Sequence, residues 1–267
     1  MFQMYNVIYC EFLKIKKSHF YLSLILIVSI LPIGLNLLAT NGSSLKNSVN
    51  YIFLIEKASF NFLTIPLSTL IAAYIFTREF SLKTMSNLFC YPASKLKIFF
   101  SKLVFILLLT ASLIFFQLFF ALLLGSVFNH AELTKNLLLV YLKLNLYHIL
   151  CLYAILPIAI LIALLCKNSI IPFIYSAVVC ICNSYMSVFI PMANKNTLGY
   201  AFKNNCDYIP IYFPIKILSN FFNQTKDKIL IIPNAVPLHN ISIFIDLILF
   251  IMGTLLCFVY YNFQDIY

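Results

Sequence analysis

Six long apolar segments decide what this chain of 267 residues can fold into. Each is long enough to cross a bilayer as a helix, and together they cover about 19–39, 60–77, 98–125, 137–165, 170–192 and 240–261. The apolar runs are continuous rather than alternating, which favours helices over a membrane barrel. Only 10% of the residues are charged, against roughly a quarter in soluble domains. We therefore expect an all-α integral membrane protein with six transmembrane helices.

The first eighteen residues form a segment of their own, in which apolar and polar side chains separate onto two helical faces. The apolar face holds Tyr5, Ile8, Tyr9, Phe12 and Ile15, and the polar face holds Asn6, Cys10, Lys14 and Lys17. This pattern predicts an interfacial helix over residues 1–18 with its apolar face in lipid. Glu11 and Lys14 are spaced i, i+3 and can pair. The alternative is a plain basic leader that only sets topology.

The stretch Phe76–Lys102, between the second and third apolar segments, combines basic and apolar residues. Arg78 and Glu79 close the preceding helix with a charged pair. A brief helix with one apolar face would follow, formed by Met85, Leu88 and Phe89.

This brief helix has a clear end, because Pro92 disfavours helix in the residue before it. Ser94 can then cap a new helix through its hydroxyl. A compact, basic, partly apolar loop suits binding to another protein. The alternative is an ordinary positive loop that anchors helices at lipid headgroups.

The orientation rests on where the basic residues cluster. The eighteen Lys and Arg residues divide nine and nine between the two sides, so their number gives no bias. Those on the side of the N-terminus lie close to the first and third spans, where positive charge holds a loop in the cytoplasm. We expect both termini in the cytoplasm.

The loop at 193–239 carries four prolines and the apolar-aromatic run Tyr208–Phe222. That run is too short and too interrupted to span a bilayer, so we expect it to dip into or lie on the outer leaflet. A disordered surface loop is the alternative, but the content of Tyr, Phe and Ile argues against disorder.

The sequence shows no recognisable set of catalytic residues. The four histidines are scattered, and the five glycines form no phosphate-binding loop, so we expect no enzyme and no nucleotide bound by this chain. The eight cysteines suggest neither a disulfide framework nor a metal site. An ionisable group inside a span is a functional candidate by default. The best is Asp246, with Lys143 as a possible partner along a transport path.

The order of residues after the second span resembles the permease subunits of type-2 ABC exporters. The matching residues are Glu79, Phe80, Thr84, Leu88, Pro92, Ser94, Lys95 and Lys102, and Lys83 stands where the family usually has Gly. Glu11 and Lys14 match a Glu-x-x-Lys pattern in the interfacial helix of those permeases.

The resemblance covers nearly the whole chain and implies one permease domain over residues 1–267. Its parts would be an interfacial helix (1–18), a cytoplasmic coupling loop (78–97) and an extracellular re-entrant loop (193–239) before the last helix. The resemblance implies that the coupling loop contacts a separate cytoplasmic ATPase, which binds ATP and Mg²⁺. The implied contact residues are Arg78, Glu79, Phe80, Lys83, Thr84, Met85, Leu88 and Phe89.

The nearest resemblance is to the small permeases of lantibiotic and bacitracin self-protection in Gram-positive bacteria. It implies a protein of the bacterial cell membrane that expels membrane-active peptides beside a second permease, either another copy or a sister chain. The alternative is a non-ABC membrane protein, such as a small secondary transporter or a structural partner.

Overall fold

The fold is seen in a computed structural model that describes residues 2–40, 48–82, 94–129, 135–189 and 240–263. The described residues form helices and no strand. The elements are α1 (Phe2–Lys17), α2 (Phe20–Thr40), α3 (Ser48–Ala58), η2 (Ser59–Leu63), α4 (Thr64–Ser81), α6 (Lys95–Asn129), α7 (Lys135–Cys166), α8 (Ile170–Phe189) and α11 (Asn240–Phe263).

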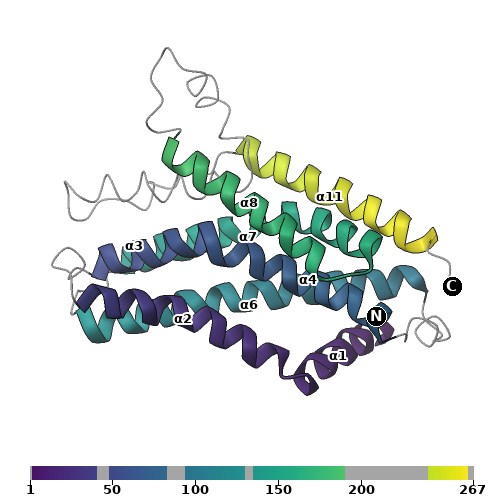
Figure 1. Ribbon diagram of the computed structural model, residues 1–267, viewed down its shortest axis with the longest axis horizontal. Helices are drawn as coiled ribbons and strands as arrows, with labels where there is room; N and C mark the ends of the chain where they lie inside the picture. The colour runs from purple at the N-terminus through teal and green to yellow at the C-terminus, as the bar shows by residue number, and fades with distance from the viewer. Residues whose placement is uncertain (1, 41–47, 83–93, 130–134, 190–239, 264–267) are drawn as a thin grey trace, which may run out of the picture.

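The long helices run side by side in one bundle, and both ends of the chain lie at the same end of it (Figure 1). We call this the α1 end, because α1 lies there with the end of α4 and the start of α6. The opposite end holds α3 and the start of α7, and we call it the α3 end. Helix α1 lies at an angle to the bundle, and the chain turns from α1 into α2 at His19, whose φ is 53°.

Five helical stretches are long and apolar enough to cross a membrane: Phe20–Leu37, Tyr51–Ser81, Lys95–Val127, Leu138–Cys166 and Ile243–Phe263. The apolar part of α8, Ile170–Met186, is shorter. The prediction of an all-α membrane protein is thus confirmed, and the fifth predicted span, 170–192, corresponds to α8. The predicted re-entrant loop at 193–239 lies outside the described residues.

The second span differs most from its prediction. We expected it over about 60–77, but the helix begins at Ser48 and continues through η2 to the end of α4 at Ser81. The segment η2 is a π-helical turn, in which the N–H of Thr64 donates to the carbonyl of Ser59, five residues back. The predicted span left Glu56 and Lys57 outside it, in the connection that precedes residue 60. The helix continues because the Glu56 side chain faces inward, with 2% of the residue exposed.

The start of α6 follows its prediction. The N–H of Lys97 donates to Oγ of Ser94 at 3.4 Å, three residues earlier, which is the expected cap. The preceding brief helix, predicted from Met85, Leu88 and Phe89 and ended by Pro92, lies outside the described residues.

Helix α1 is present, but its two faces differ from the predicted ones. Tyr9 and Phe12, expected on one apolar face with Ile8 and Ile15, are each 52% exposed. Ile15 is 3% exposed and Ile8 packs against the same buried cluster. Glu11 lies on this inward face and is 4% exposed. The face that meets the bundle therefore carries charge, and other apolar side chains point outward.

Helices α7 and α11 approach most closely where Gly253 meets Pro157. A Cβ at Gly253 would lie 2.6 Å from Cβ of Pro157, which is closer than non-bonded carbon atoms approach one another. One turn further on, the thiol of Cys257 donates to the carbonyl of Pro157 at 3.0 Å. Only glycine allows this contact, since the proline ring cannot rotate away.

Gly253→Ala is expected to push α11 away from α7 and to lower the free energy of unfolding by about 1–3 kcal/mol, as overpacking of a core does. Gly34→Ala on α2 is the matched control, because nothing lies within 4 Å of a Cβ there. Thermal unfolding in detergent measures both. Equal midpoints for the two variants would contradict the close packing.

Candidate functional site

The candidate site is built around Glu79, close to the end of α4. Ala72, Phe76 and Glu79 are spaced i, i+4, i+7, so they lie on one helical face, and all three are buried. That face meets α6 and α11, and Glu79 is only 4% exposed. A carboxylate removed from water to this extent requires positive partners.

Two lysines from other helices supply that positive charge. Oε2 of Glu79 accepts a hydrogen bond from Nζ of Lys102 on α6, and Lys102 is fully buried. Oε1 of Glu79 lies 3.2 Å from Nζ of Lys14 on α1. Lys14 also lies 2.7 Å from Oε1 of Glu11, so that predicted i, i+3 pair is confirmed.

These four residues form what we call the ion network: Glu11, Lys14, Glu79 and Lys102. It contains two carboxylates and two ammonium groups, so its formal charges cancel. It joins α1, α4 and α6, and its last two members lie on either side of residues 83–93 in the sequence.

Lys14 is positively charged at neutral pH. Burial by itself would lower the pKa of Lys14, but the carboxylates of Glu11 and Glu79 raise it above its ordinary value of 10.5. The ammonium group therefore stays protonated and holds both carboxylates.

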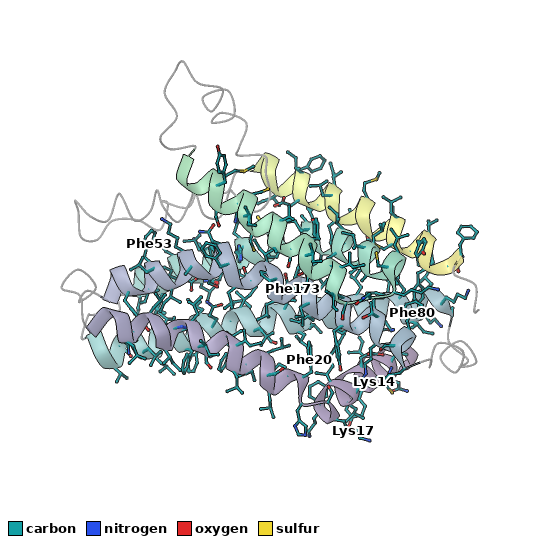
Figure 2. All side chains as sticks on the ribbon, viewed as in Figure 1. Lys14, Lys17, Phe20, Phe53, Phe80 and Phe173 are labelled. Atoms are coloured by element: carbon teal, nitrogen blue, oxygen red, sulfur yellow. The ribbon has the colours of Figure 1, made fainter. Side chains whose placement is uncertain are left out.

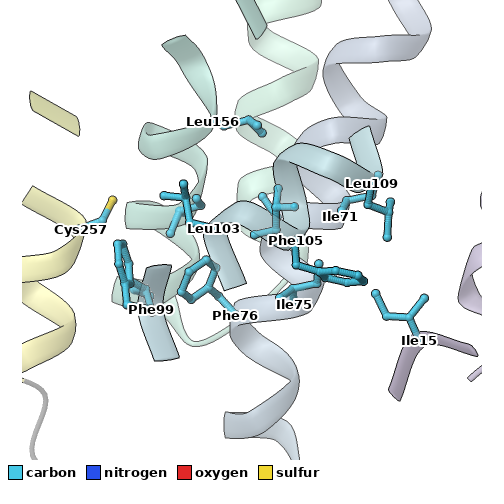
Figure 3. Packing of buried hydrophobic residues seen from close by; sticks show 14 of the residues in the cluster. Ile15, Ile71, Ile75, Phe76, Phe99, Leu103, Phe105, Leu109, Leu156 and Cys257 are labelled. Atoms are coloured by element: carbon cyan, nitrogen blue, oxygen red, sulfur yellow. The ribbon is translucent and has the colours of Figure 1, made fainter. Parts of the chain in front are cut away.

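A buried hydrophobic cluster supports the ion network from the inside of the bundle. Phe76 and Phe99 are packed with their ring centroids 5.5 Å apart, and Nζ of Lys102 lies 5.6 Å from the centroid of Phe76. Figure 3 shows Ile15 of α1 and Cys257 of α11 at opposite sides of this cluster. Because the same side chains pack three helices together, the ion network cannot shift without disturbing them.

Basic side chains surround the α1 end. Lys16, Lys17, Lys97 and Lys167 are exposed there. The guanidinium of Arg78 lies 5.8 Å from the ring centroid of Tyr74, and Nζ of Lys167 lies 5.7 Å from that of Phe80. Figure 2 places Lys14, Lys17 and Phe80 at this end of the bundle, far from Phe53.

The predicted coupling residues fall into two groups. Arg78, Glu79 and Phe80 are described, and the structure brings Glu79 together with the predicted pair Glu11 and Lys14. Helix α4 directs the carboxylate of Glu79 inward, where it pairs with Lys102 and Lys14. The remaining predicted residues lie outside the described part of the chain: Lys83, Thr84, Met85, Leu88 and Phe89.

The structure does not bring Asp246 and Lys143 together. Asp246 on α11 is 4% exposed, and its Oδ2 accepts a hydrogen bond from the thiol of Cys151 on α7 at 3.2 Å. Lys143 is exposed on α7. Asp246 is buried as a candidate should be, but its described partner is a thiol rather than an ammonium group.

Sequence reasoning missed a second buried polar group at the α3 end. Glu56 accepts a hydrogen bond from Asn145 of α7, and His148 of α7 lies 2.8 Å from Oγ1 of Thr64. Asn145, His148 and Cys151 are spaced i, i+3, i+6 along one inward face of α7. That periodicity was a usable signal, as was the apolar run Tyr51–Ile55 just before Glu56.

The ion network should govern stability at the α1 end. Lys102→Met leaves Glu79 without its buried partner and is expected to lower the free energy of unfolding by about 3 kcal/mol, as for other broken buried pairs. Lys14→Met should cost less than about 1 kcal/mol, because 36% of that side chain is exposed. Denaturant unfolding in detergent measures both variants.

The double variant Glu79→Gln/Lys102→Met tests whether the two residues act together. It should be more stable than the sum of the single changes predicts, because no charge is left unpaired between them. Additive effects would contradict a direct interaction.

Comparison with known families gives one match. Residues 7–183, more than half of the chain, match the family model described as "ABC-2 family transporter protein". The match includes α1 from residue 7 onward, the ion network and all of α2 to α7. A search of curated proteins finds no significant match.

Proposed function

Because the chain belongs to the ABC-2 transporter family, in which a membrane component works with an ABC ATPase, we propose that its ion network couples this ATPase to the membrane helices. The observation that carries the proposal is the position of Glu79. This residue is joined to Lys102 across residues 83–93 and to Lys14 on α1.

The mechanism follows from how the two ends of this loop are held. A partner that grips residues 83–93 pulls on the end of α4 and the start of α6. The buried pair Glu79–Lys102 resists separation of these two ends, because two charges would lose their partners in a poorly solvated place. The displacement therefore passes to both helices together, and through Lys14 to α1.

The proposed orientation places the α1 end in the cytoplasm. Four exposed lysines lie at this end, among the described residues, against three at the α3 end (Lys57, Lys135 and Lys143), and the positive-inside rule favours the more basic end as the cytoplasmic face. The side chains of Tyr9 and Phe12, exposed on α1, would then lie in the inner leaflet beside the basic rim. The ATPase would contact Arg78, Phe80 and the residues that follow them.

The proposed cargo is a membrane-active peptide moved from the bilayer to the outside. A cavity of about 10 Å³ between α2, α4 and α6 has room for no more than one water molecule. The outward faces of α2, α8 and α11 carry large apolar side chains, including Ile30, Leu37, Ile181 and Phe244. An amphipathic cargo would therefore travel along such a face, against lipid or a second permease, rather than through the interior of this chain.

The coupling proposal is tested by purifying the tagged chain with its ATPase and measuring ATP hydrolysis in the complex. Met85→Ala/Leu88→Ala should release the ATPase, because it removes the apolar face expected to dock. Glu79→Gln should keep the ATPase bound but lose the response of hydrolysis to cargo. Lys17→Ala, which also removes a charge at the α1 end, is the control and should behave as wild type.

If no nucleotide-binding protein copurified with the wild type, the coupling proposal would fail and the loop would serve merely as a topology anchor. The same conclusion would follow if the double alanine variant bound the ATPase and hydrolysed ATP as the wild type does.

The cargo is tested separately in cells. Bacteria that lack this chain are expected to become several-fold more sensitive to lantibiotics or to bacitracin, and expression of the chain should restore resistance. Growth inhibition across a panel of peptide antibiotics measures this. Unchanged sensitivity to every peptide would refute the cargo and leave the coupling proposal standing.

A further inference from the structure

Glu56 on α3 is a second buried glutamate, and its surroundings differ from those of Glu79. It is 2% exposed, and its Oε2 accepts a hydrogen bond from Nδ2 of Asn145 on α7 at 3.2 Å. The same nitrogen donates to the carbonyl of Tyr141 at 3.0 Å, which fixes the orientation of the amide. Among the residues that the structure describes, none gives Oε1 of Glu56 a hydrogen bond.

The side chains around this contact are apolar. They belong to one buried cluster that fills the space between α3, α6 and α7: Tyr51, Ile52, Phe53, Ile55, Phe60, Leu118, Ala121, Val140, Tyr141, Leu144, Tyr147 and Cys151. An ionised carboxylate in such a place would have one amide donor and no positive partner among the described residues, and this is strongly unfavourable.

The ionisable groups on neighbouring elements do not change this balance. Lys57, next in the chain, is exposed and lies 6.0 Å from the ring centroid of Phe53. On α3, the hydroxyl of Tyr51 donates to the carbonyl of Pro32.

The ionisable groups that α7 buries in this region are Tyr141, Tyr147, His148 and Cys151. Nε2 of His148 is engaged with Oγ1 of Thr64, and the thiol of Cys151 donates to Asp246 of α11. The segment η2 has no ionisable residue. The ionisable residues of α2 and α6 all lie toward the α1 end: Tyr21, Lys95, Lys97 and Lys102.

We propose that Glu56 is a proton-binding site, which the closed α3–α7 contact holds as a neutral carboxylic acid. Its Oε2 keeps the hydrogen bond from Asn145, and its Oε1 carries the proton. A hydroxyl without an acceptor is far less costly to bury than an ion without a counter-ion. The family membership and the proposed coupling at the α1 end do not enter this argument.

Proton binding by Glu56 makes the contact between α3 and α7 depend on pH. If α3 and α7 separate and water reaches Glu56, the carboxyl ionises at neutral pH and releases its proton, as an exposed glutamate does. The closed contact thus binds one proton more than the open one. By linkage, acidification favours the closed contact and alkaline conditions favour opening.

The test is infrared spectroscopy of the purified chain in lipid at neutral pH. The wild type should show a carbonyl band of a protonated carboxylic acid, and Glu56→Gln should remove that component. Glu79→Gln is the matched control and should leave the band intact, because Glu79 is ionised between two lysines. Asp246→Asn identifies any contribution of Asp246, another buried acid.

A second variant distinguishes removal of the acid from misfolding of the protein. Glu56→Asp keeps an acid at the site, so it should shift the band rather than remove it. If both Glu56 variants leave the band of the wild type unchanged, or if the wild type shows no such band, Glu56 is ionised and the proposal fails. A band in the carboxylate region that depends on added sodium or potassium would likewise overturn it, in favour of a bound cation.

Discussion

The burial of Glu79 is the constraint on which the α1 end depends. A glutamate near the end of a membrane helix could reach water, but α4 turns this one toward the bundle, where positive groups compensate for the lost hydration of its carboxylate. Lys102 and Lys14 do so from two other helices. The position of α1 against the bundle follows from this requirement, as does the fully buried lysine near the start of α6.

The continuous helix from α3 through η2 to α4 carries one buried glutamate toward each end, and the two have opposite surroundings. Glu79 has two ammonium partners, whereas Glu56 has one amide. The first arrangement favours a fixed charge that ties helices together. The second favours a neutral group that changes its charge when its contact opens. One continuous helix thus connects the site that we propose for coupling with the site that we propose for binding a proton.

The sequence predicted the helices well, because long apolar runs leave a membrane chain few alternatives. It also predicted the pair Glu11–Lys14 and the Ser94 cap, which are local contacts. It did not predict that Glu79 faces inward or that Lys102 is its partner, because their contact depends on how α4 and α6 pack. Glu56 was missed for the same reason, since its partner Asn145 is 89 residues away. It also precedes the apolar segment predicted for the second span, about 60–77.

Hydrogen–deuterium exchange of α1 would test the central claim most directly. If Glu79 holds α1 against the bundle, Glu79→Gln should accelerate exchange of the α1 amides while those of α7 keep their wild-type protection. Lys17→Ala should change neither helix. Unchanged protection of α1 in Glu79→Gln would contradict the account, because α1 would then be held by its apolar contacts alone. An equal loss of protection in α1 and α7 would also contradict it, because the change would then reflect general destabilisation.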